Sequence, residues 1–481
     1  MRHNRCVPPT SYDAIPYETV VRFETHPDRL AAVGRFYGMD PAPVERCRYL
    51  EIGCGDGGNI VPMAYLLPES RFVGVDAAAV PIAAGERMRA ALGIGNLALE
   101  AGDLRDIGES WGQFDYIVAH GVYSWVPADV RDALLRVCRE RLAPNGIAFT
   151  SYNTLPGRHV RQYLRDLMLF HTRNIGGLGP RLEQARWSLQ FLAGSPRLPD
   201  VWRPLLESDI AILLHLGDGA LFHDDFAEID DPVYFHEFAA HAARHGLQYL
   251  GDADLPEMFD PQGLLESVPG GVLEREQYMD FLKARRFRQT LLCHQGLKLE
   301  RRPVEDCVDR FLFSSLCHTL EDGKIEGLRR VRITAVHEAA RNVAAALGEV
   351  YPLPLSFQEL VPYAGNETNL RSVLAGMVLG GFADFHVYPF PCQETLSSHP
   401  SASRLARFQA MDSRRVTNAG FRVVELDEVA SHLLQLLDGT RSHRQIAEDL
   451  ARVSGAPPLE QIDQCLPASL EWLAHATLLE S

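Results

Sequence analysis

The sequence lacks any framework of paired cysteines. Its nine cysteines are odd in number and scattered, and no two of them stand in a Cys-x-x-Cys spacing. This pattern excludes a disulfide-stapled scaffold and a zinc knuckle, and it is typical of reduced thiols. The adjacent pairs Cys293-His294 and Cys317-His318 have no second ligand pair near them in the sequence, so we expect no metal site.

Long hydrophobic runs are also missing. No segment approaches the ~20 consecutive apolar residues that a membrane-spanning helix needs. Arg2, His3 and Arg5 stand near the start of the chain, but no apolar stretch follows them as it would in an export signal. The sequence therefore predicts a cytoplasmic protein without a membrane span.

Basic residues are the minority among the charged ones. The chain has 47 Lys and Arg against 63 Asp and Glu, a formal net charge of −16. Such a polyanion repels nucleic acid, so nucleic acid is not an expected partner. One basic group stands out, and we interpret it as a solvated helix face or a contact between domains. This group comprises Lys283, Arg285, Arg286, Arg288, Lys298, Arg301 and Arg302.

A chain of 481 residues exceeds what one hydrophobic core usually supports, so two to four domains are expected. The composition, with 46% hydrophobic and 23% charged residues, is that of an ordinary globular protein. We distinguish an N-terminal arm and helix (1–45), a Rossmann-like core (46–156), a helical insertion (157–220), a core-completing region (221–304), and two winged-helix-like modules (305–392 and 393–481).

The region from Cys47 to Tyr152 alternates short β-branched or aromatic runs with helical stretches. This order predicts a parallel sheet wrapped by helices, that is, a doubly wound α/β domain. The expected strands are 49–52, 71–75, 98–100, 116–119 and 147–152, and the expected helices are 60–67, 80–92 and 128–142. Pro144-Asn145-Gly146 is a stop-and-turn signal before the last of these strands.

After Pro156-Gly157 the pattern becomes helical as far as residue 216, which predicts a helical insertion over the site. One more helix and a strand at 247–250 would then return to the sheet, so that the core closes near residue 260.

Beyond residue 305 a scheme of three helices and a short strand occurs twice, which predicts two winged-helix-like units. The expected helices are 342–347, 356–363 and 369–379 with a strand at 383–387, and then 433–437, 442–451 and 459–475 with a strand at 477–480. On an acidic chain we expect such units to be recognition or assembly surfaces rather than DNA-binding domains.

A glycine-rich turn, Glu51-Ile52-Gly53-Cys54-Gly55-Asp56-Gly57, follows the first expected strand. Glycines at this place let a ligand approach backbone N–H groups that point into the crevice at the carboxyl end of the sheet. The spacing Gly-x-Gly-x-Gly after an acid differs from the Gly-x-Gly-x-x-Gly of a dinucleotide site, and it suits a ligand without a pyrophosphate. Taken alone, the run is also compatible with a plain tight turn.

Two further acids stand at strand ends. Asp76, followed by Ala77, ends the second expected strand, where a carboxylate can accept both hydroxyls of a ribose. Asp103, followed by Leu104, comes after the third strand, where a carboxylate can take the amino group of an adenine. Each acid alone is more often a turn former or a helix cap, but three acids at three strand ends indicate a binding site.

With these motifs in place, residues 49–152 resemble the seven-stranded, class I S-adenosylmethionine-dependent methyltransferase core. The stretch from Phe114 to Val122 resembles that family's fourth motif. The resemblance implies S-adenosyl-L-methionine as the cofactor, with the glycine turn at its methionine part, Asp76 at its ribose, and Asp103 with Leu104 at its adenine. The full set of expected cofactor residues is Glu51, Gly53, Cys54, Gly55, Asp56, Gly57, Asp76, Ala77, Asp103, Leu104 and His120.

A closer resemblance covers nearly the whole chain. The sequence is similar to bacterial methyltransferases that carry a methyltransferase regulatory domain, among them rickettsial lysine methyltransferases that modify outer-membrane proteins. The matching stretches are Ser11 to Tyr17, His120 to Pro127, Ser151 to Gly157, Glu276 to Phe281 and Arg285 to Arg288. That family also has a C-terminal winged-helix-like region, so the resemblance implies the same layout here.

The residues best placed to meet a methyl acceptor follow the fourth and fifth strands. They are His120, Tyr123, Trp125, Tyr152 and Asn153. Aromatic walls suit an acceptor that passes from amine to methylammonium. The alternative is that Tyr123 and Trp125 are packing residues and that His120 caps a backbone group.

Tyr12 and Tyr17 precede the first strand in a segment that contains Pro16. We hypothesise that this arm orders when the cofactor binds and closes the site.

Three functions remain open. The first is a protein lysine N-methyltransferase, in which the C-terminal modules present a polypeptide. The second is a methyltransferase that acts on a small molecule or biosynthetic intermediate. The third is a cofactor-binding regulator with little activity, which the intact glycines and acids disfavour.

Overall fold

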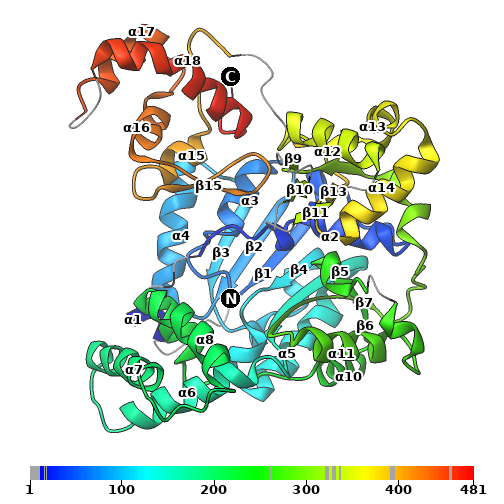
Figure 1. The fold of residues 1–481 in the computed structure, drawn as a ribbon. Helices are drawn as coiled ribbons and strands as arrows, with labels where there is room; N and C mark the ends of the chain where they lie inside the picture. Colours follow the sequence, from blue (N-terminus) through cyan, green and yellow to red (C-terminus); the bar gives the residue numbers. More distant parts are fainter. Residues whose placement is uncertain are drawn as a thin grey trace.

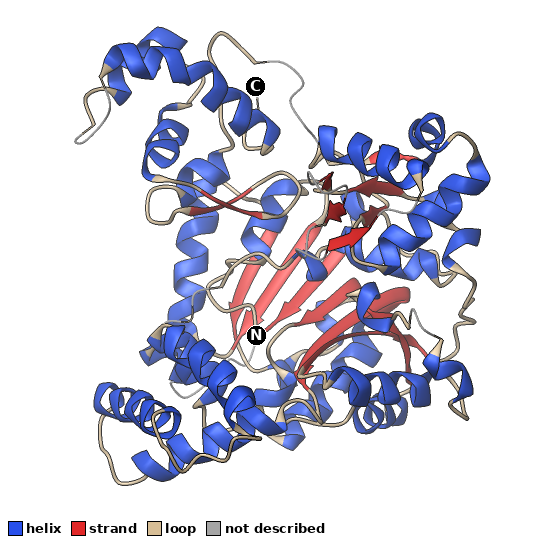
Figure 2. Ribbon diagram, in the orientation of Figure 1, coloured by secondary structure: helices blue, strands red, loops and turns tan. Residues whose placement is uncertain are grey.

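The structure is a computed structural model that describes residues 11–15, 17, 19–260, 263–319, 324–327, 332–334, 337–390, 396–453 and 458–480. A seven-stranded sheet with the order β3-β2-β1-β4-β5-β7-β6 forms its centre (Figures 1 and 2). The strands are β1 (Arg48–Ile52), β2 (Arg71–Asp76), β3 (Leu97–Ala101), β4 (Phe114–Ala119), β5 (Leu142–Asn153), β6 (Leu247–Asp252) and β7 (Phe287–His294). Strands β1 to β5 are parallel, and β7 is antiparallel to both of its neighbours. The predicted Rossmann-like α/β core is confirmed.

The two faces of the sheet are covered by different helices. Because side chains alternate along a strand, Tyr49 on β1 packs into one hydrophobic cluster and its neighbour Leu50 into another. The first face packs against α2 (Pro27–Phe36), α3 (Ile60–Leu66) and α4 (Ala79–Leu92), and the second against α5 (Ala128–Arg141) and α10 (Phe235–Arg244). Helix α11 (Val272–Lys283) lies against α10. The carboxyl edge of the parallel strands, where the predicted site residues stand, lies between these layers.

The helical insertion consists of α6 (His159–Thr172), α7 (Leu178–Ala193) and α8 (Arg203–His215), as the sequence predicts. It has a hydrophobic cluster of its own, which includes Leu164, Leu189 and Leu213. In Figure 1 these helices project at the lower left. The short helix α9 (Asp218–Ala220) and a single π-helical stretch, Leu221–Asp225, lead the chain back toward the sheet.

The expectation that the core closes near residue 260 is wrong. Strand β7, Phe287–His294, inserts between β5 and β6, so the sheet is complete only at His294. The polar residues Arg288-Gln289-Thr290 near the start of β7 do not follow the pattern of a buried strand, so the sequence did not predict it. Arg288 is nevertheless fully buried, and Arg285 nearly so, because Asp280, Glu276 and Asp252 surround them. The interpretation of these two arginines as a solvated helix face is therefore wrong.

The first C-terminal module contains α12 (Glu338–Val350), α13 (Phe357–Ala364) and α14 (Glu367–Leu379). Its sheet has the order β12 (Leu355–Ser356), β8 (Leu312–Ser314), β13 (Asp384–His386). A second small sheet joins β9 (His318–Thr319), β10 (Lys324–Glu326) and β11 (Arg332–Thr334). All three helices and the final strand lie where the sequence predicts them.

The second C-terminal module contains α15 (Arg404–Gln409), α16 (Glu428–Leu436), α17 (His443–Leu450) and α18 (Leu459–His475). Its strands are the hairpin β14 (Arg415–Thr417) and β15 (Val423–Glu425). The strand expected at 477–480 is reduced to a single bridge between Ala402 and Leu479. The module contacts the core where the Tyr65 hydroxyl on α3 donates to Glu480 Oε1 (2.7 Å).

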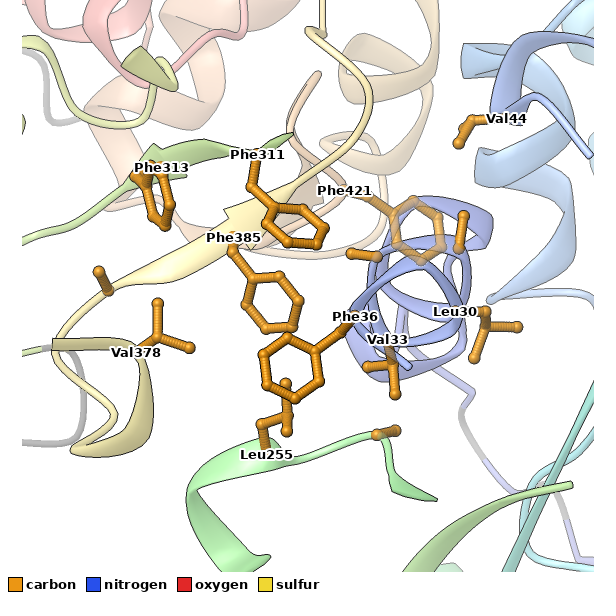
Figure 3. Close-up of a cluster of buried hydrophobic side chains, with 14 of the residues drawn as sticks. Leu30, Val33, Phe36, Val44, Leu255, Phe311, Phe313, Val378, Phe385 and Phe421 are labelled. Atoms are coloured by element: carbon orange, nitrogen blue, oxygen red, sulfur yellow. The ribbon is translucent and has the colours of Figure 1, made fainter. Parts of the chain in front are cut away.

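Helix α2 joins the core to the first module. Figure 3 shows Val33 and Phe36 of this helix beside Phe385 of β13, with the Phe311 ring 5.4 Å from that of Phe385. Asp28, in the first turn of the same helix, accepts the backbone N–H of Val387 (2.7 Å). The core and this module therefore share one hydrophobic cluster.

Among the residues described, no helix is both long enough and apolar enough to cross a membrane.

Candidate active site

The glycine turn has a backbone that only glycine adopts easily. Gly53, Gly55 and Gly57 have φ angles of +75°, +55° and +78°. The backbone N–H of Gly53 donates to the carbonyl of Val75 (2.8 Å), which ties the turn to the end of β2. A side chain at Gly53 would lie 2.5 Å from Val122 Cγ2. The turn is thus packed tightly against the ends of β2 and β4.

Glu51 on β1 is a buried carboxyl group. Its Oε1 accepts the side-chain N–H of Asn59 (3.0 Å), while its Oε2 is buried and has no hydrogen-bond partner among the described residues. Burial raises the pKa of Glu51 to about 8. A buried acceptor without a partner is costly unless a ligand donates to it, so this oxygen suits the ammonium group of a bound methionine moiety.

Asp76, at the carboxyl end of β2, faces the same turn. Its two carboxylate oxygens accept the backbone N–H groups of Gly55 (2.9 Å) and Ala78 (2.8 Å). Burial raises the pKa of this carboxyl group above its ordinary value. Each oxygen keeps acceptor capacity for a hydroxyl group, as ribose recognition requires. Ala77 next to it is exposed.

Asp103 is held differently from the other two acids. It caps the short helix Leu104–Asp106, and its carboxylate forms an ion pair with Arg105 (2.6 Å). Leu104 is buried beside it. The position at the carboxyl edge agrees with an adenine contact, but the charge of Asp103 is already compensated by a cation.

Cys54 and Asp56 have opposite surroundings within the turn. The Cys54 side chain is buried in the hydrophobic core, and burial raises the pKa of its thiol well above the ordinary value. Asp56 Oδ1 accepts the Gly58 N–H (3.0 Å) and the hydroxyl of Thr19. Only backbone atoms of Cys54 are therefore available to a ligand, whereas Asp56 faces the N-terminal arm.

The arm lies across the glycine turn. The Thr19 hydroxyl accepts the Gly58 N–H (2.8 Å), and the backbone N–H of Arg22 donates to Asn59 Oδ1 (2.8 Å). Nearer the N-terminus, Asp13 accepts the N–H of Val80 (3.0 Å) in the first turn of α4. These bonds connect the arm to both sides of the crevice in which we expect the cofactor.

Both tyrosines of the arm contact the returning end of the insertion. The Tyr12 ring stacks on His223 with centroids 3.8 Å apart, and the Tyr17 hydroxyl donates to Asp224 Oδ2 (3.3 Å). Burial and the carboxylates of Asp224 and Asp76 raise the pKa of Tyr12. Tyr12 therefore lies within electrostatic reach of the acid at the expected ribose position.

His120 at the end of β4 is neutral. Burial lowers its pKa to about 3, and its Nδ1 lies 3.2 Å from the hydroxyl of Ser151. The same hydroxyl accepts the N–H of Gly121 (2.8 Å). The His120 ring is 6.0 Å from that of Phe287 on β7. It can shape the site and form hydrogen bonds, but it does not act as an acid near neutral pH.

Tyr123 and Tyr152 lie in the hydrophobic core between the sheet and α10. Tyr152 is fully buried, stacks on Phe238 at 4.2 Å, and shares a hydrogen bond with the Thr290 hydroxyl (2.9 Å). The Tyr123 hydroxyl is 2.9 Å from His241 Nδ1. The expectation that these two rings form the acceptor wall is corrected here, because their positions offer packing rather than contact with a ligand.

Trp125 ends the short helix Tyr123–Trp125 that follows β4, and Asn153 is the last residue of β5. The indole N–H of Trp125 is buried without a partner among the described residues. Asn153 is buried and donates its side-chain N–H to Asp230 (2.7 Å). Asp230 in turn pairs with Arg158 (2.8 Å). Asn153 therefore anchors the chain that returns from the insertion, and the Trp125 N–H is an unused donor.

Asp224, for which the sequence led to no prediction, contacts the N-terminal arm through Tyr17. It is half-buried beside the buried Asp225, and both desolvation and that neighbour raise its pKa to about 6. Arg158 fixes the segment by donating to the Asp224 carbonyl (2.8 Å) and by pairing with Asp225 (3.0 Å). No local motif marks Asp224, because the contacts that define it join residues far apart in the sequence.

A cavity of about 440 Å³ opens at the ends of β6 and β7. Its lining includes four acidic and three basic side chains, and the Phe287 ring lies 6.0 Å from that of His120. The lining residues are Glu24, Asp252, Asp254, Glu257, Lys283, Ala284, Arg285, Arg286, Phe287 and Gln289. The basic members belong to the group predicted to be a solvated helix face or a contact between domains.

Comparison with known proteins agrees with this geometry. A methyltransferase domain matches residues 50–148, a predicted methyltransferase regulatory domain matches 217–294, and the C-terminal winged helix domain of PKMT matches 398–455. PKMT2 from Rickettsia typhi in complex with AdoHcy superimposes with a TM-score of 0.85 at 28% identity, over 96% of this chain and 100% of that one. The chain is therefore an S-adenosylmethionine-dependent methyltransferase.

Sequence relatives define the family more narrowly. Protein RP789 of Rickettsia prowazekii is 31% identical over 469 residues, which is 91% of this chain and 85% of that protein. The ubiquinone biosynthesis O-methyltransferase of Chelativorans is 36% identical, but over only 25% of this chain and 46% of that enzyme. The protein belongs to the methyltransferases that combine the class I core with the regulatory domain and a C-terminal winged-helix domain.

Proposed function

We propose that the protein transfers methyl groups from S-adenosylmethionine to lysine side chains of a polypeptide. The observation that carries this proposal is the extent of the likeness to PKMT2, which includes the insertion and both C-terminal modules as well as the core. The likeness to the O-methyltransferase, by contrast, covers a quarter of the chain. The parts outside the core are those that can receive an acceptor.

The proposed cofactor contacts follow from the geometry. Glu51 Oε2 would accept the methionine ammonium, and the glycine turn, which has no side chains at Gly53 and Gly55, would let the methionine part approach the backbone closely. Asp76 would accept the ribose hydroxyls, and Asp103 with Leu104 would lie at the adenine. When bound, the cofactor supplies an electrophilic methyl group, and the residues of this chain have to hold the acceptor in line with it.

A lysine acceptor must lose a proton before its nitrogen can attack. Lowering an amine pKa from ~10.4 to neutrality takes about 4–5 kcal/mol, which burial and a nearby base can supply. Asp224 is suited to take this proton, because its pKa of about 6 leaves the carboxylate ionised at neutral pH. The Tyr17 hydroxyl, 3.3 Å away, would orient that carboxylate.

The cavity at the ends of β6 and β7 offers a place for the acceptor side chain. Its lining mixes acidic side chains with Lys283, Arg285 and Arg286, and Phe287 adds an aromatic face of the kind that methylammonium groups prefer. The net charge of −16 would also steer a basic polypeptide toward the protein. The cytoplasmic location inferred from the sequence belongs to this proposal as well.

The test is methylation with a labelled methyl group. A lysine-rich polypeptide and the same polypeptide with acetylated lysines are incubated with enzyme and cofactor. Label in the first and none in the second supports the proposal. Label only in the small-molecule fraction of a cell lysate would favour a biosynthetic methyltransferase. Tight cofactor binding with no label in any fraction would favour a regulator.

A further inference from the structure

Two histidines and an aspartate meet between α5 and α10. His241 lies in the last turn of α10, and His245 follows the end of that helix. The spacing of four residues places both rings on one face of the helix. Asp132 reaches them from the neighbouring helix α5. In the part of the chain that the structure describes, these three side chains form a group whose potential metal-ligand atoms lie close together.

The distances are those of a metal ligand set. Asp132 Oδ1 lies 3.4 Å from His241 Nε2 and 2.9 Å from His245 Nε2, and all three ligand atoms are within 4.8 Å of one another. Ligand atoms of a tetrahedral zinc site, with bonds of ~2.0–2.1 Å, stand about 3.3 Å apart. The three atoms therefore need only small adjustments to surround one ion.

The remaining features of the cluster also suit a metal. The Tyr123 hydroxyl lies 2.9 Å from His241 Nδ1, the kind of outer contact that orients a metal-binding imidazole. Asp132 is 62% exposed, which leaves a coordination position for water.

We propose that Asp132, His241 and His245 bind a divalent transition-metal ion of the zinc class. Two imidazoles and one carboxylate favour zinc over magnesium or calcium, which prefer oxygen ligands. The ion would link α5 to α10, the two helices that cover one face of the sheet. Through His241 and Tyr123 it would also fix the turn Tyr123–Trp125 that follows β4. Its role would be structural support of the acceptor side.

The test uses the untagged full chain, treated with a chelator and with its exposed thiols alkylated so that cysteine does not compete. Cobalt is titrated in and followed by visible absorption, and zinc is then added. We expect one ion per chain, the intense bands of four-coordinate cobalt, a dissociation constant in the micromolar range, and displacement by zinc.

Variants assign the ion to the cluster. His245→Gln and Asp132→Asn should each weaken binding at least about tenfold. The matched control is His475→Gln, which changes an exposed histidine at the end of α18 and should leave binding unchanged. Zinc should raise Tm for the unaltered chain and the control, and leave Tm of the two cluster variants unaffected.

Three results would overturn the proposal. They are the absence of stoichiometric binding at micromolar metal, equal binding by Asp132→Asn and the unaltered chain, and loss of binding in the His475→Gln control. Because the Asp132 side chain is mainly exposed, its replacement leaves the fold intact and keeps the test decisive if His245→Gln does not fold.

Discussion

Buried acids gather at both ends of the central sheet, but only one end supplies cations to match them. At the β6–β7 end, Asp252, Glu276 and Asp280 face Arg285 and Arg288. At the β1–β2 end, Glu51 and Asp76 accept hydrogen bonds from amide groups and form no ion pair within the described part of the chain. Buried acids that are compensated internally support the fold, whereas buried carboxyl groups without a cation, such as Glu51 with its raised pKa, suit a ligand that brings one. S-adenosylmethionine brings a sulfonium and an ammonium group.

The largest expected effect is at the compensated end. Arg288→Met should lower the free energy of unfolding by about 3–5 kcal/mol, because it leaves Asp280 and Glu276 buried without their closest cation. Chemical denaturation measures this loss. Adding Asp280→Asn to Arg288→Met should restore part of the stability, since it removes one uncompensated charge.

The control for that prediction is Arg302→Met. Arg302 pairs with Glu300 at 2.8 Å, but both side chains are largely exposed, so the loss should stay within about 1 kcal/mol. If the two arginine variants are equally stable, the distinction between the two ends of the sheet does not hold.

At the uncompensated end, Asp76→Asn should weaken cofactor binding by about 10–100-fold, which corresponds to ~1.5–3 kcal/mol for hydrogen bonds to a charged group. Titration calorimetry with S-adenosylhomocysteine measures this, and thermal unfolding of the free protein should change little. Asp115→Asn is the control, because Asp115 lies at the opposite end of β4 and pairs with the half-exposed Arg48. Unchanged affinity in Asp76→Asn would remove this residue from the site.

The raised pKa of Glu51 makes the free energy of unfolding depend on pH. Its pKa is about 8 in the folded chain and about 4.5 in an unfolded one, so the folded state holds the proton more tightly. Its contribution to stability is complete below pH 4.5 and is lost as the pH rises through 8. Between pH 6 and 7 this single group should cost about 1.4 kcal/mol of stability. Glu51→Gln should remove that part of the slope, and an identical slope in both proteins would contradict the assignment.

The smallest effect is expected in the arm. Tyr17→Phe removes the hydroxyl that contacts Asp224, which should lower kcat/KM by a few-fold, or about 0.5–1.5 kcal/mol, with little change in Tm. Tyr12→Phe keeps the stacking on His223 and should act more weakly on stability than on turnover. Tyr163→Phe on the exposed surface of the insertion is the control. Unchanged turnover in both arm variants would exclude the arm from the mechanism.

The prediction of strands was correct where each strand depends on residues that are neighbours in the sequence. Strands β1 to β5 follow from β-branched and aromatic runs, and the glycine turn from its spacing, because both depend on neighbours in the sequence. Strand β7 was missed because Arg288 looks like a surface residue until Asp280 and Glu276 are brought to it. The acceptor wall was misassigned for the same reason. Tyr152 is an aromatic residue of the kind that lines binding sites. Its contacts with Phe238 and Thr290, both distant in sequence, show that it belongs to the core.

The sequence by itself determined the class of the protein. A glycine turn and acids at strand ends are short-range patterns, and the backbone conformation that they require is fixed by the residues themselves. Tertiary structure alone decided which buried charges have partners, which rings pack in the core, and which residues meet at Asp224 and at Asp132. Those properties depend on side chains that folding brings together, over separations from 8 residues for Arg288 and Asp280 to 207 for Tyr17 and Asp224. Their energies arise only when folding removes the water between these groups.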